Sequence, residues 1–188
     1  MSEQSRGGPP VSRSALVLTA SDRGAAGVRE DSSGAVVAER LTGLGFAVER
    51  TVVADDRPTI EATLVAATRR HNLVVTTGGT GLTPRDVTPQ ATLAVIDYEV
   101  PGLAEAMRAE GRRHTPMADL SRAVAGVRDG ALIVNLPGSP TGAIESLEAI
   151  VPVLDHALET LAGPFDHGDR PTATTEDPRI VPFPDERE

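Results

Sequence analysis

The chain has 188 residues and a formal net charge of -9, with 2% aromatic residues and no cysteine, tryptophan or lysine. This length is enough for one domain, whose core must be built from alanine, valine, leucine and isoleucine. The composition excludes disulfide bonds and covalent catalysis through a thiol or a lysine imine. The acidic balance argues against non-specific binding of nucleic acid, which requires a basic surface.

The two ends of the chain differ in composition from its middle. Residues 1–13 are rich in glycine, serine and proline, which predicts a flexible tail. Residues 164–188 carry five prolines and seven acidic residues against three arginines, which predicts a disordered or loosely attached tail. The folded domain is therefore expected at residues 14–163. No run of about 18 apolar residues and no apolar core of a signal peptide is present, so we expect a cytoplasmic protein without membrane contact.

Short apolar runs alternate with helical patterns inside the expected domain. Strands are expected at residues 15–22, 47–55, 72–79 and 130–140. Helices are expected at residues 31–45, 57–70, 88–100, 101–113, 116–126 and 141–163. Asp31 or Ser32 and Thr88 are the expected helix caps, and Pro152 is expected to bend or interrupt the last helix. The alternation predicts a three-layer α/β/α fold with a mostly parallel central sheet, because right-handed crossovers place helices on both faces.

The loop after the third expected strand has the sequence TTGGTGLTPRD, which contains Thr77, Gly78, Gly79, Thr80 and Gly81. Glycines let backbone N–H groups approach an anion closely, and the start of the following helix adds positive potential. These features suit a phosphate group. The loop is neither a Walker A motif nor G-x-G-x-x-G, and the alternative is a tight turn that needs glycine for positive φ.

Aspartates follow three of the expected strands. Asp22 comes after Ser21, Asp55 comes with Asp56, and Asp86 lies in the glycine loop. The carboxyl ends of the strands form the ligand edge of an open α/β sheet, so we expect these side chains near the phosphate. Carboxylates repel phosphate unless Mg²⁺ lies between them or one of them moves a proton. The alternative for each aspartate is a helix cap or a turn.

A third loop at the same edge has the sequence NLPGSP. Pro137 and Pro140 stiffen it, Gly138 opens access to its backbone, and Ser139 can donate a hydrogen bond to a phosphate or a ring. A plain turn is the alternative. The four histidines lack the spacing and the cysteine partners of a zinc site, so no zinc is expected.

Five stretches of the chain resemble, in the same order, the molybdopterin-binding family of molybdenum cofactor biosynthesis (Mog/MoaB type). They are LTASDRGAAGVREDSSG, VVADDRPTIEATL, VVTTGGTGLTPRDVTPQAT, PGLAEAMR and LIVNLPGSP, and the resemblance spans residues 14–163. It implies a three-layer domain that is commonly trimeric and sometimes hexameric. It also implies transfer of AMP from MgATP to the terminal phosphate of molybdopterin, with release of pyrophosphate. The adenylylated product would then be handed to a molybdate-insertion enzyme.

The resemblance also implies roles for particular residues. Asp55 and Asp86 correspond to the two functionally critical aspartates, which we expect to hold or orient Mg²⁺ and the phosphates. The nucleophile is itself a phosphate, which agrees with a site that lacks cysteine and lysine. The expected substrate-binding residues are Ser21, Asp22, Thr77, Gly78, Gly79, Thr80, Gly81, Glu105, Pro137, Gly138, Ser139 and Pro140.

Two other interpretations remain open at this point. One is a MoaB-type paralogue that binds molybdopterin as a carrier or partner protein with little or no adenylyl transfer. The other is an unrelated phosphate-binding α/β protein. The first would bind molybdopterin without forming an ATP-dependent product, and the second would bind ATP without affinity for the pterin.

Overall fold

The computed structural model describes residues 13–163. The two predicted tails therefore lie outside the described residues, except for Arg13. A six-stranded sheet forms the centre of the molecule, with strand order β2-β1-β3-β6-β5-β4. The strands are β1 (Ser14–Ala20), β2 (Ala47–Val53), β3 (Leu73–Thr77), β4 (Tyr98–Glu99), β5 (Ala125–Arg128) and β6 (Ala131–Leu136). Strands β2, β1, β3 and β6 are parallel, whereas β5 is antiparallel to both β6 and β4. The expected mostly parallel sheet is confirmed.

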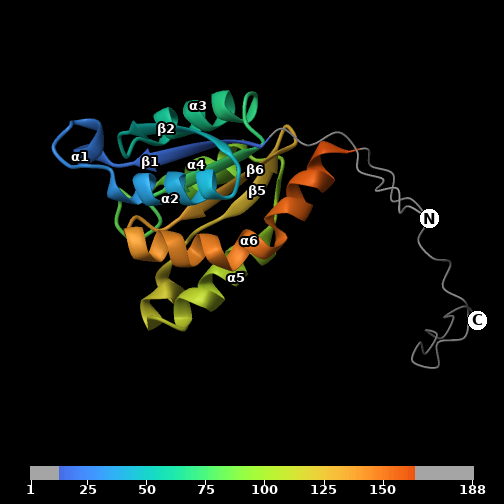
Figure 1. Ribbon diagram of the computed structural model, residues 1–188. Helices are drawn as coiled ribbons and strands as arrows, with labels where there is room; N and C mark the ends of the chain where they lie inside the picture. Colours follow the sequence, from blue (N-terminus) through green and yellow to red (C-terminus); the bar gives the residue numbers. More distant parts are fainter. Residues whose placement is uncertain (1–12, 164–188) are drawn as a thin grey trace, which may run out of the picture.

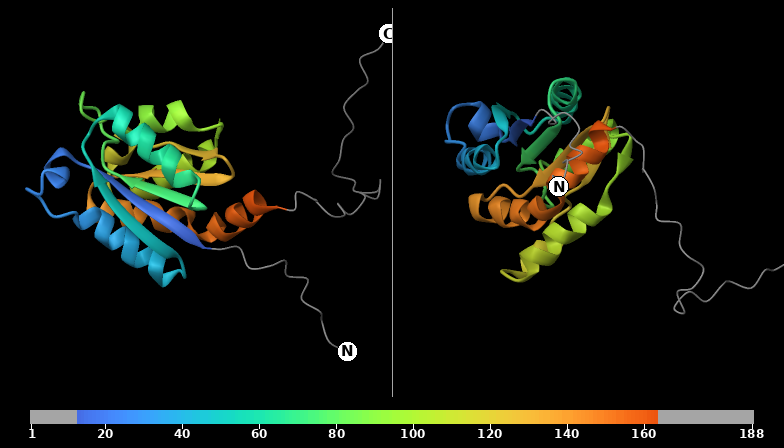
Figure 2. Two further views of the ribbon diagram at one scale, coloured as in Figure 1. Left: turned by 90° about the horizontal axis from the view of Figure 1, so that it is seen from above. Right: turned by 45° about the vertical axis from the view of Figure 1, so that its right-hand side comes forward.

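Helices cover both faces of this sheet (Figure 1, Figure 2). The helices are α1 (Asp22–Ala25), α2 (Ser32–Gly43), α3 (Arg57–Thr68), α4 (Thr88–Val95), α5 (Pro101–Arg112), the 3-10 helix η1 (Pro116–Leu120) and α6 (Pro140–Ala162). Side chains of α2, α5 and α6 share one core cluster with one face of the sheet. Side chains of α3 and α4 share a second cluster with the other face. The three-layer α/β/α fold is therefore also confirmed.

Strand β1 shows why the apolar runs of the sequence are continuous. Ala15 and Val17 belong to the cluster beneath α2, α5 and α6, whereas Leu16 and Leu18 belong to the cluster beneath α3 and α4. All four side chains are buried. Successive residues of a strand point to opposite faces, so a strand covered on both sides needs apolar residues at every position.

The expected helix at residues 88–100 is wrong in its second half. Helix α4 ends at Val95, and the edge strand β4 follows it. The Val100 N–H donates to the Ala125 carbonyl at 2.8 Å. In addition, Pro101 disfavours helical backbone at the residue before it. Pairing with β5 therefore overrides the local helical pattern.

The expected helix at residues 116–126 is also wrong. Only its first residues are helical, as η1, and its end forms β5. Asp129 and Gly130 connect β5 to β6 with φ angles of 49° and 76°, as in a tight hairpin turn. A Cβ atom on Gly126 would lie 2.8 Å from the Tyr98 carbonyl oxygen, so this glycine allows β5 to pair closely with β4.

The helix ends follow the sequence signals in part. Asp31 caps α2 as expected, since its carboxylate accepts the Gly34 N–H at 2.8 Å. Thr88 is not the N-cap of α4 but its first helical residue, because Val87 occupies the cap position. Helix α6 stays one helix across Pro152, and Figure 1 shows that its second part runs in a different direction. No helix within residues 13–163 combines the length and the apolarity needed to cross a membrane.

Candidate active site

Three loops meet at the carboxyl ends of β1, β3 and β6, and glycines make this approach possible. Gly78 and Gly79 have φ angles of 86° and 64°, which favour glycine. A Cβ on Gly78 would lie 2.6 Å from the Ala20 carbonyl oxygen, and a Cβ on Gly138 would lie 3.2 Å from Gly78 Cα. The Gly78 N–H also donates to the Leu136 carbonyl at 3.3 Å. The expected convergence of the loops is therefore present, and a side chain at either glycine would push them apart.

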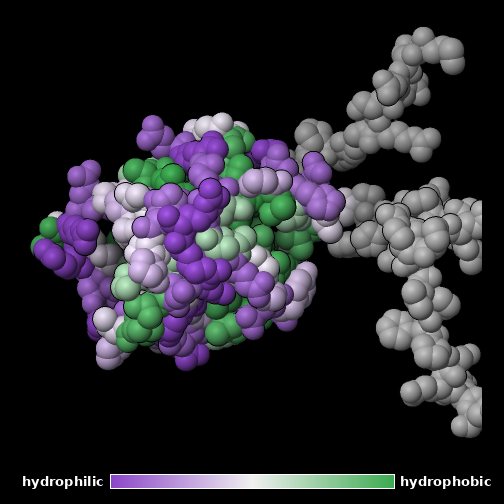
Figure 3. Space-filling view, turned by 90° about the horizontal axis from the view of Figure 1, so that it is seen from below, coloured by the Kyte–Doolittle hydropathy of each residue, from purple (hydrophilic) through white to green (hydrophobic). Residues whose placement is uncertain are grey.

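A pocket of about 290 Å³ opens beside this contact, and we call it the apolar pocket. Its walls come from the glycine loop, the loop after β6, α5, η1 and the start of α6. Its apolar lining includes Met107, Met117, Leu120 and Ala123, and its expected site residues are Thr80, Gly81, Pro137 and Ser139. Figure 3 views the molecule from the side of α5 and α6 and shows separate hydrophobic areas among hydrophilic ones.

A second pocket of about 140 Å³ opens between the same loops and the start of α2, and we call it the polar pocket. It shares no lining residue with the apolar pocket. Its lining is Thr19, Ala20, Ser21, Gly24, Arg29, Glu30, Asp31, Ser32, Ser33, Gly78 and Gly138. Gly138 lines the polar pocket while its neighbours Pro137 and Ser139 line the apolar pocket, so two chemically different pockets lie on either side of the loop after β6.

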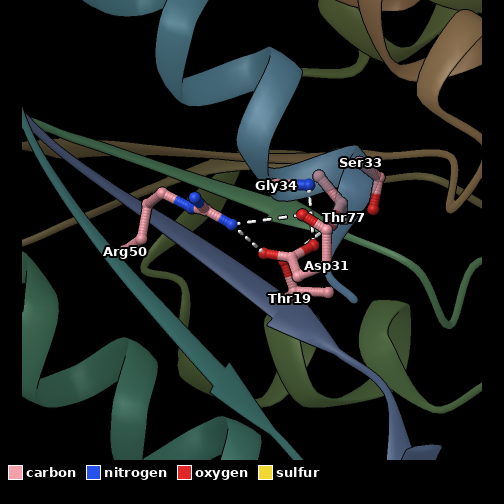
Figure 4. Close-up of polar contacts among 6 residues, drawn as sticks. All are labelled: Thr19, Asp31, Ser33, Gly34, Arg50 and Thr77. Atoms are coloured by element: carbon pink, nitrogen blue, oxygen red, sulfur yellow. Dashed lines mark hydrogen bonds and ion pairs between the residues drawn. The ribbon is translucent and has the colours of Figure 1, made fainter. Parts of the chain in front are cut away.

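The wall of the polar pocket is built around Asp31 (Figure 4). Its carboxylate accepts the Gly34 N–H at 2.8 Å and Arg50 Nη2 at 2.8 Å. Burial raises the pKa of Asp31, but hydrogen bonds from Arg50, Gly34 and Thr19 outweigh burial and hold that pKa below its usual value. The carboxyl group is therefore ionised at neutral pH and gives this wall a fixed negative charge.

Three buried hydroxyls connect this wall to the glycine loop (Figure 4). Thr77 Oγ1 lies 3.1 Å from Thr19 Oγ1 and 3.1 Å from Ser33 Oγ, within hydrogen-bond distance. Thr77 directly precedes Gly78, so the hydroxyl cluster holds the base of the loop. Thr77 was among the expected substrate-binding residues. Thr19, Ser33 and Arg50 were not, because their contacts join separate elements.

The ends of β1 and β2 are joined by a reciprocal pair of hydrogen bonds. The Asp22 N–H donates to Asp55 Oδ2 at 2.9 Å, and the Asp55 N–H donates to Asp22 Oδ1 at 3.0 Å. Arg85 of the glycine loop forms an ion pair with Asp22 Oδ2. Ser21 caps α1, where its Oγ accepts the Gly24 N–H at 3.1 Å. The expected residues Ser21, Asp22 and Asp55 thus lie together, with an arginine beside them.

Asp86 closes the exposed turn of the glycine loop. Its Oδ2 accepts the Thr83 N–H at 2.8 Å and the Thr83 hydroxyl at 2.6 Å. Burial raises the pKa of Asp86, but hydrogen bonds from Thr83 and Gly81 and the nearby Arg122 guanidinium lower it below its usual value. Arg122 also donates to the carbonyl oxygens of Gly81 and Asp86. Arg122 was not among the expected site residues.

Comparison with known families now decides the identity of the domain. The model of the family described as "Probable molybdopterin binding domain" matches residues 16–156. The chain belongs to this family. A protein of Helicobacter pylori (strain J99) named molybdopterin adenylyltransferase is 42% identical over 156 residues, which covers 79% of this chain and 88% of that protein. A protein of the same name from Escherichia coli (strain K12) is 42% identical over 139 residues, which covers 71% of each.

Solved structures of the family have the same fold as this molybdopterin-binding domain. The molybdopterin biosynthesis enzyme MoaB from Thermus thermophilus superposes with a TM-score of 0.75 at 51% identity, covering 80% of this chain and 97% of that one. The molybdopterin biosynthesis Mog protein from Mycobacterium ulcerans gives a TM-score of 0.75 at 45% identity, covering 79% and 99%.

Some residues that we expected at the site of this molybdopterin-binding domain line neither pocket. Glu105 is exposed on α5, away from both linings. Thr77 belongs to the hydroxyl cluster, and Gly79 packs against Thr88. Pro140 is the first residue of α6. Asp55 and Asp86 are outside both linings as well.

The aspartates at the strand ends offer Mg²⁺ only part of its ligands. Within residues 13–163, no group of three or more histidine, aspartate or glutamate side chains is close enough to hold a metal ion. Asp22 and Asp55 nevertheless place two carboxylates at one point of the ligand edge. Mg²⁺ commonly uses one or two protein carboxylates and takes its other ligands from water and substrate phosphates. The donor set of the molybdopterin-binding domain therefore suits Mg²⁺ that arrives with a nucleotide.

Proposed function

We propose that this protein is a molybdopterin adenylyltransferase of molybdenum cofactor biosynthesis. The observation that carries the proposal is the meeting of an apolar and a polar pocket at the glycine loop. A transferase must hold two substrates with their reacting groups in contact, and two pockets lined by neighbouring residues of the same loops support this arrangement. The names of the relatives from Helicobacter pylori and Escherichia coli support the same activity.

The chemistry of the pockets supports one placement of the two substrates. The apolar pocket, with Met107 and Met117 in its lining, suits the flat pterin ring. The polar pocket, with the carboxylates of Glu30 and Asp31 and the hydroxyls of Ser32 and Ser33, suits the hydroxyl and amino groups of the nucleoside, which can donate to these oxygens. The phosphates of both substrates would then lie at the loops between the pockets, where glycine N–H groups can approach them.

The reaction needs no side-chain nucleophile. An oxygen of the terminal phosphate of molybdopterin attacks the α-phosphorus of ATP. The bond from that phosphorus to the bridging oxygen breaks, and pyrophosphate leaves with the electron pair. The attacking phosphate is already an anion, so the protein contributes position and charge neutralisation. This agrees with a chain that contains no cysteine and no lysine.

The charged side chains at the strand ends would perform that neutralisation. Arg85 is largely exposed and pairs with Asp22, so a phosphate can compete for its guanidinium. Asp55 uses Oδ2 for the Asp22 N–H, which leaves its other oxygen for Mg²⁺, and the Asp22 carboxylate lies beside it. Asp86 is the second proposed ligand, as the family resemblance implies. Mg²⁺ held there would offset charge on the phosphates of ATP. Glu105, which is exposed on α5, stays a proposed substrate-binding residue.

The assembly and the setting of the protein belong to the same proposal. We propose a homotrimer, with a hexamer as the alternative, working in the cytoplasm and handing its product to a molybdate-insertion enzyme. Large apolar side chains remain exposed on one chain, among them Leu93 and Tyr98. Subunit contacts would cover such side chains. A sedimentation experiment that gives a monomer at micromolar concentration would contradict the trimer.

A non-catalytic carrier of molybdopterin is the second candidate. The observation that favours it is the engagement of the aspartates in contacts within the chain: Asp22 pairs with Arg85, and Asp86 closes a turn with Thr83. In this case the two aspartates would only shape the loops. The same apolar pocket would still bind the pterin.

A product assay separates the two candidates. Purified protein is mixed with molybdopterin, ATP and Mg²⁺, and adenylylated molybdopterin and pyrophosphate are quantified. We expect product from the wild type, a loss of at least about a hundredfold in Asp86→Asn, and little change in the matched control Asp129→Asn, which lies in the β5–β6 turn. No product together with tight molybdopterin binding would support the carrier. Unchanged turnover and Mg²⁺ dependence in Asp86→Asn would remove Asp86 from the site.

A further inference from the structure

Arg122 makes an unusual set of contacts with the glycine loop. It follows Ser121, the C-cap of η1, and precedes Ala123, and both of these neighbours line the apolar pocket. Its Nε donates to the Gly81 carbonyl at 2.6 Å, and its Nη2 donates to the Asp86 carbonyl. Its backbone N–H donates to the Thr80 carbonyl at 3.0 Å. One residue therefore bonds the loop at three points.

The two carbonyls that receive the guanidinium lie on either side of an exposed turn. Residues 82–85 are all exposed, so little packing holds them. The turn is closed internally by Asp86 and Thr83, and Arg122 fixes both of its ends to the β5 side of the molecule. This turn presents the Arg85 guanidinium and the Asp86 carboxylate. Its position therefore decides where both charges lie.

The geometry requires an arginine. A guanidinium carries several N–H donors in one rigid plane, so it can bond two carbonyl oxygens at once along fixed directions. A lysine ammonium is a single point on a flexible stem and would have to choose between them. A methionine of similar length would leave both partly buried carbonyls without their donor.

We infer that Arg122 is a positioning residue of this active site. It holds the turn at residues 81–86, which carries Asp86 and places Arg85 against Asp22 at the end of β1, and it ties the turn to the wall of the apolar pocket. Binding of the pterin in that pocket would thereby affect the positions of Arg85 and Asp86. The effect on turnover rests on the proposed function, but the restraint on the turn does not.

The test compares Arg122→Lys with Arg128→Lys. Arg128 is a matched control, because it is also partly buried and donates to a backbone carbonyl, that of Val95, at 2.6 Å, away from both pockets. We expect similar melting temperatures for the two variants. In Arg122→Lys alone, kcat should fall by about ten- to a hundredfold with KM values within about threefold, because misplaced groups lower turnover more than ground-state binding. A kcat equal to that of Arg128→Lys, with an active wild type, would overturn the inference.

Two further measurements keep the result decisive. Amide hydrogen exchange should speed up in the peptide covering residues 81–86 of Arg122→Lys and stay unchanged there in Arg128→Lys. This readout needs no activity, so it decides the inference even if the wild type forms no adenylylated product. If Arg122→Lys does not fold, Arg122→Gln replaces it.

In the Asp86→Asn background, Arg122→Lys should lower kcat far less than in the wild type, and additive losses would contradict an action through Asp86.

Discussion

The polar and the apolar pocket of this protein are built by different parts of the fold. The polar pocket lies at the ends of parallel strands and at the start of α2, where backbone, glycines and short hydroxyl side chains form the walls. The apolar pocket lies among α5, η1 and α6, where methionine and leucine side chains form much of the wall. A wall of backbone tolerates few substitutions, whereas a wall of flexible apolar side chains adapts. Changes at the polar pocket should therefore affect the fold as well as binding, and changes at the apolar pocket should mainly affect substrate affinity.

The largest effect is expected where the loops of the two pockets touch. Gly78→Ala places a side chain at a positive φ of 86°, and its Cβ would lie 2.6 Å from the Ala20 carbonyl oxygen. Gly27→Ala is the matched control, with φ of 69° and no atom within 4 Å of the added Cβ. We expect the control to lower the free energy of unfolding by about 1–2 kcal/mol through backbone strain alone. Gly78→Ala should cost clearly more, by urea denaturation. Equal losses would show that the loops are not in close contact.

A second pair of variants should separate the pockets by substrate. Met117→Ala removes an apolar wall of the apolar pocket and should raise the KM for molybdopterin by about tenfold, the equivalent of about 1.4 kcal/mol of lost burial. Ser33→Ala removes a hydroxyl from the polar pocket and should raise the KM for ATP by about two- to tenfold. Steady-state kinetics with each substrate varied in turn gives both values. If either variant raises both KM values equally, the assignment of one substrate to each pocket is wrong.

This difference between the pockets also explains what the sequence could predict. Strands β1, β3 and β6 were predicted, because burial on both faces leaves a local signature of continuous apolar residues. The edge strand β2 was also predicted, although it is partly exposed and its apolar run is interrupted by Glu49 and Arg50. The glycine loop was predicted as well, because glycines that allow a positive φ are visible in the sequence itself. The polar pocket is built largely from these local features, although the contacts of Thr19 and Arg50 join separate elements and were missed.

The surroundings of the apolar pocket were predicted less well. The first two residues of β5 were expected to end a helix, since the pairing of β5 with β4 and β6 depends on partners that the local pattern does not show. Arg122 was missed because its bonds reach the carbonyls of Gly81 and Asp86, 41 and 36 residues earlier in the chain. Glu105 was expected from the family resemblance, and the structure leaves it exposed. Residues that act through distant backbone atoms leave no motif in the sequence.

A smaller effect is expected in acid, and it belongs to the polar pocket. The pKa of Asp31 is lower in the folded protein than in the unfolded chain. Its stabilising contribution is therefore complete above the unfolded value of about 3.9 and is lost as the pH falls through the folded value. Asp31→Asn keeps a cap for α2 but loses the charge. It should melt at a lower temperature than the wild type at neutral pH, and the difference should shrink below about pH 4. A difference that is constant between about pH 7 and about pH 3 would contradict the role of the charge.

The smallest effect compares the ion pair beside each pocket. Arg50 pairs with Asp31, whose side chain is only 7% exposed, whereas Arg112 pairs with Asp119, whose side chain is 58% exposed, between α5 and η1. An exposed pair contributes little, because water and salt screen it and ordering two long side chains costs entropy. Removing the partner of a buried carboxylate leaves that carboxylate poorly compensated.

We therefore expect Arg50→Met to lower the free energy of unfolding by about 1 kcal/mol or more and Arg112→Met to lower it by less than about 0.5 kcal/mol. Urea denaturation at low and high salt measures both. A larger loss in Arg112→Met would mean that the wall between α5 and η1 is held by charge, and the contrast between a rigid polar pocket and an adaptable apolar pocket would then fail.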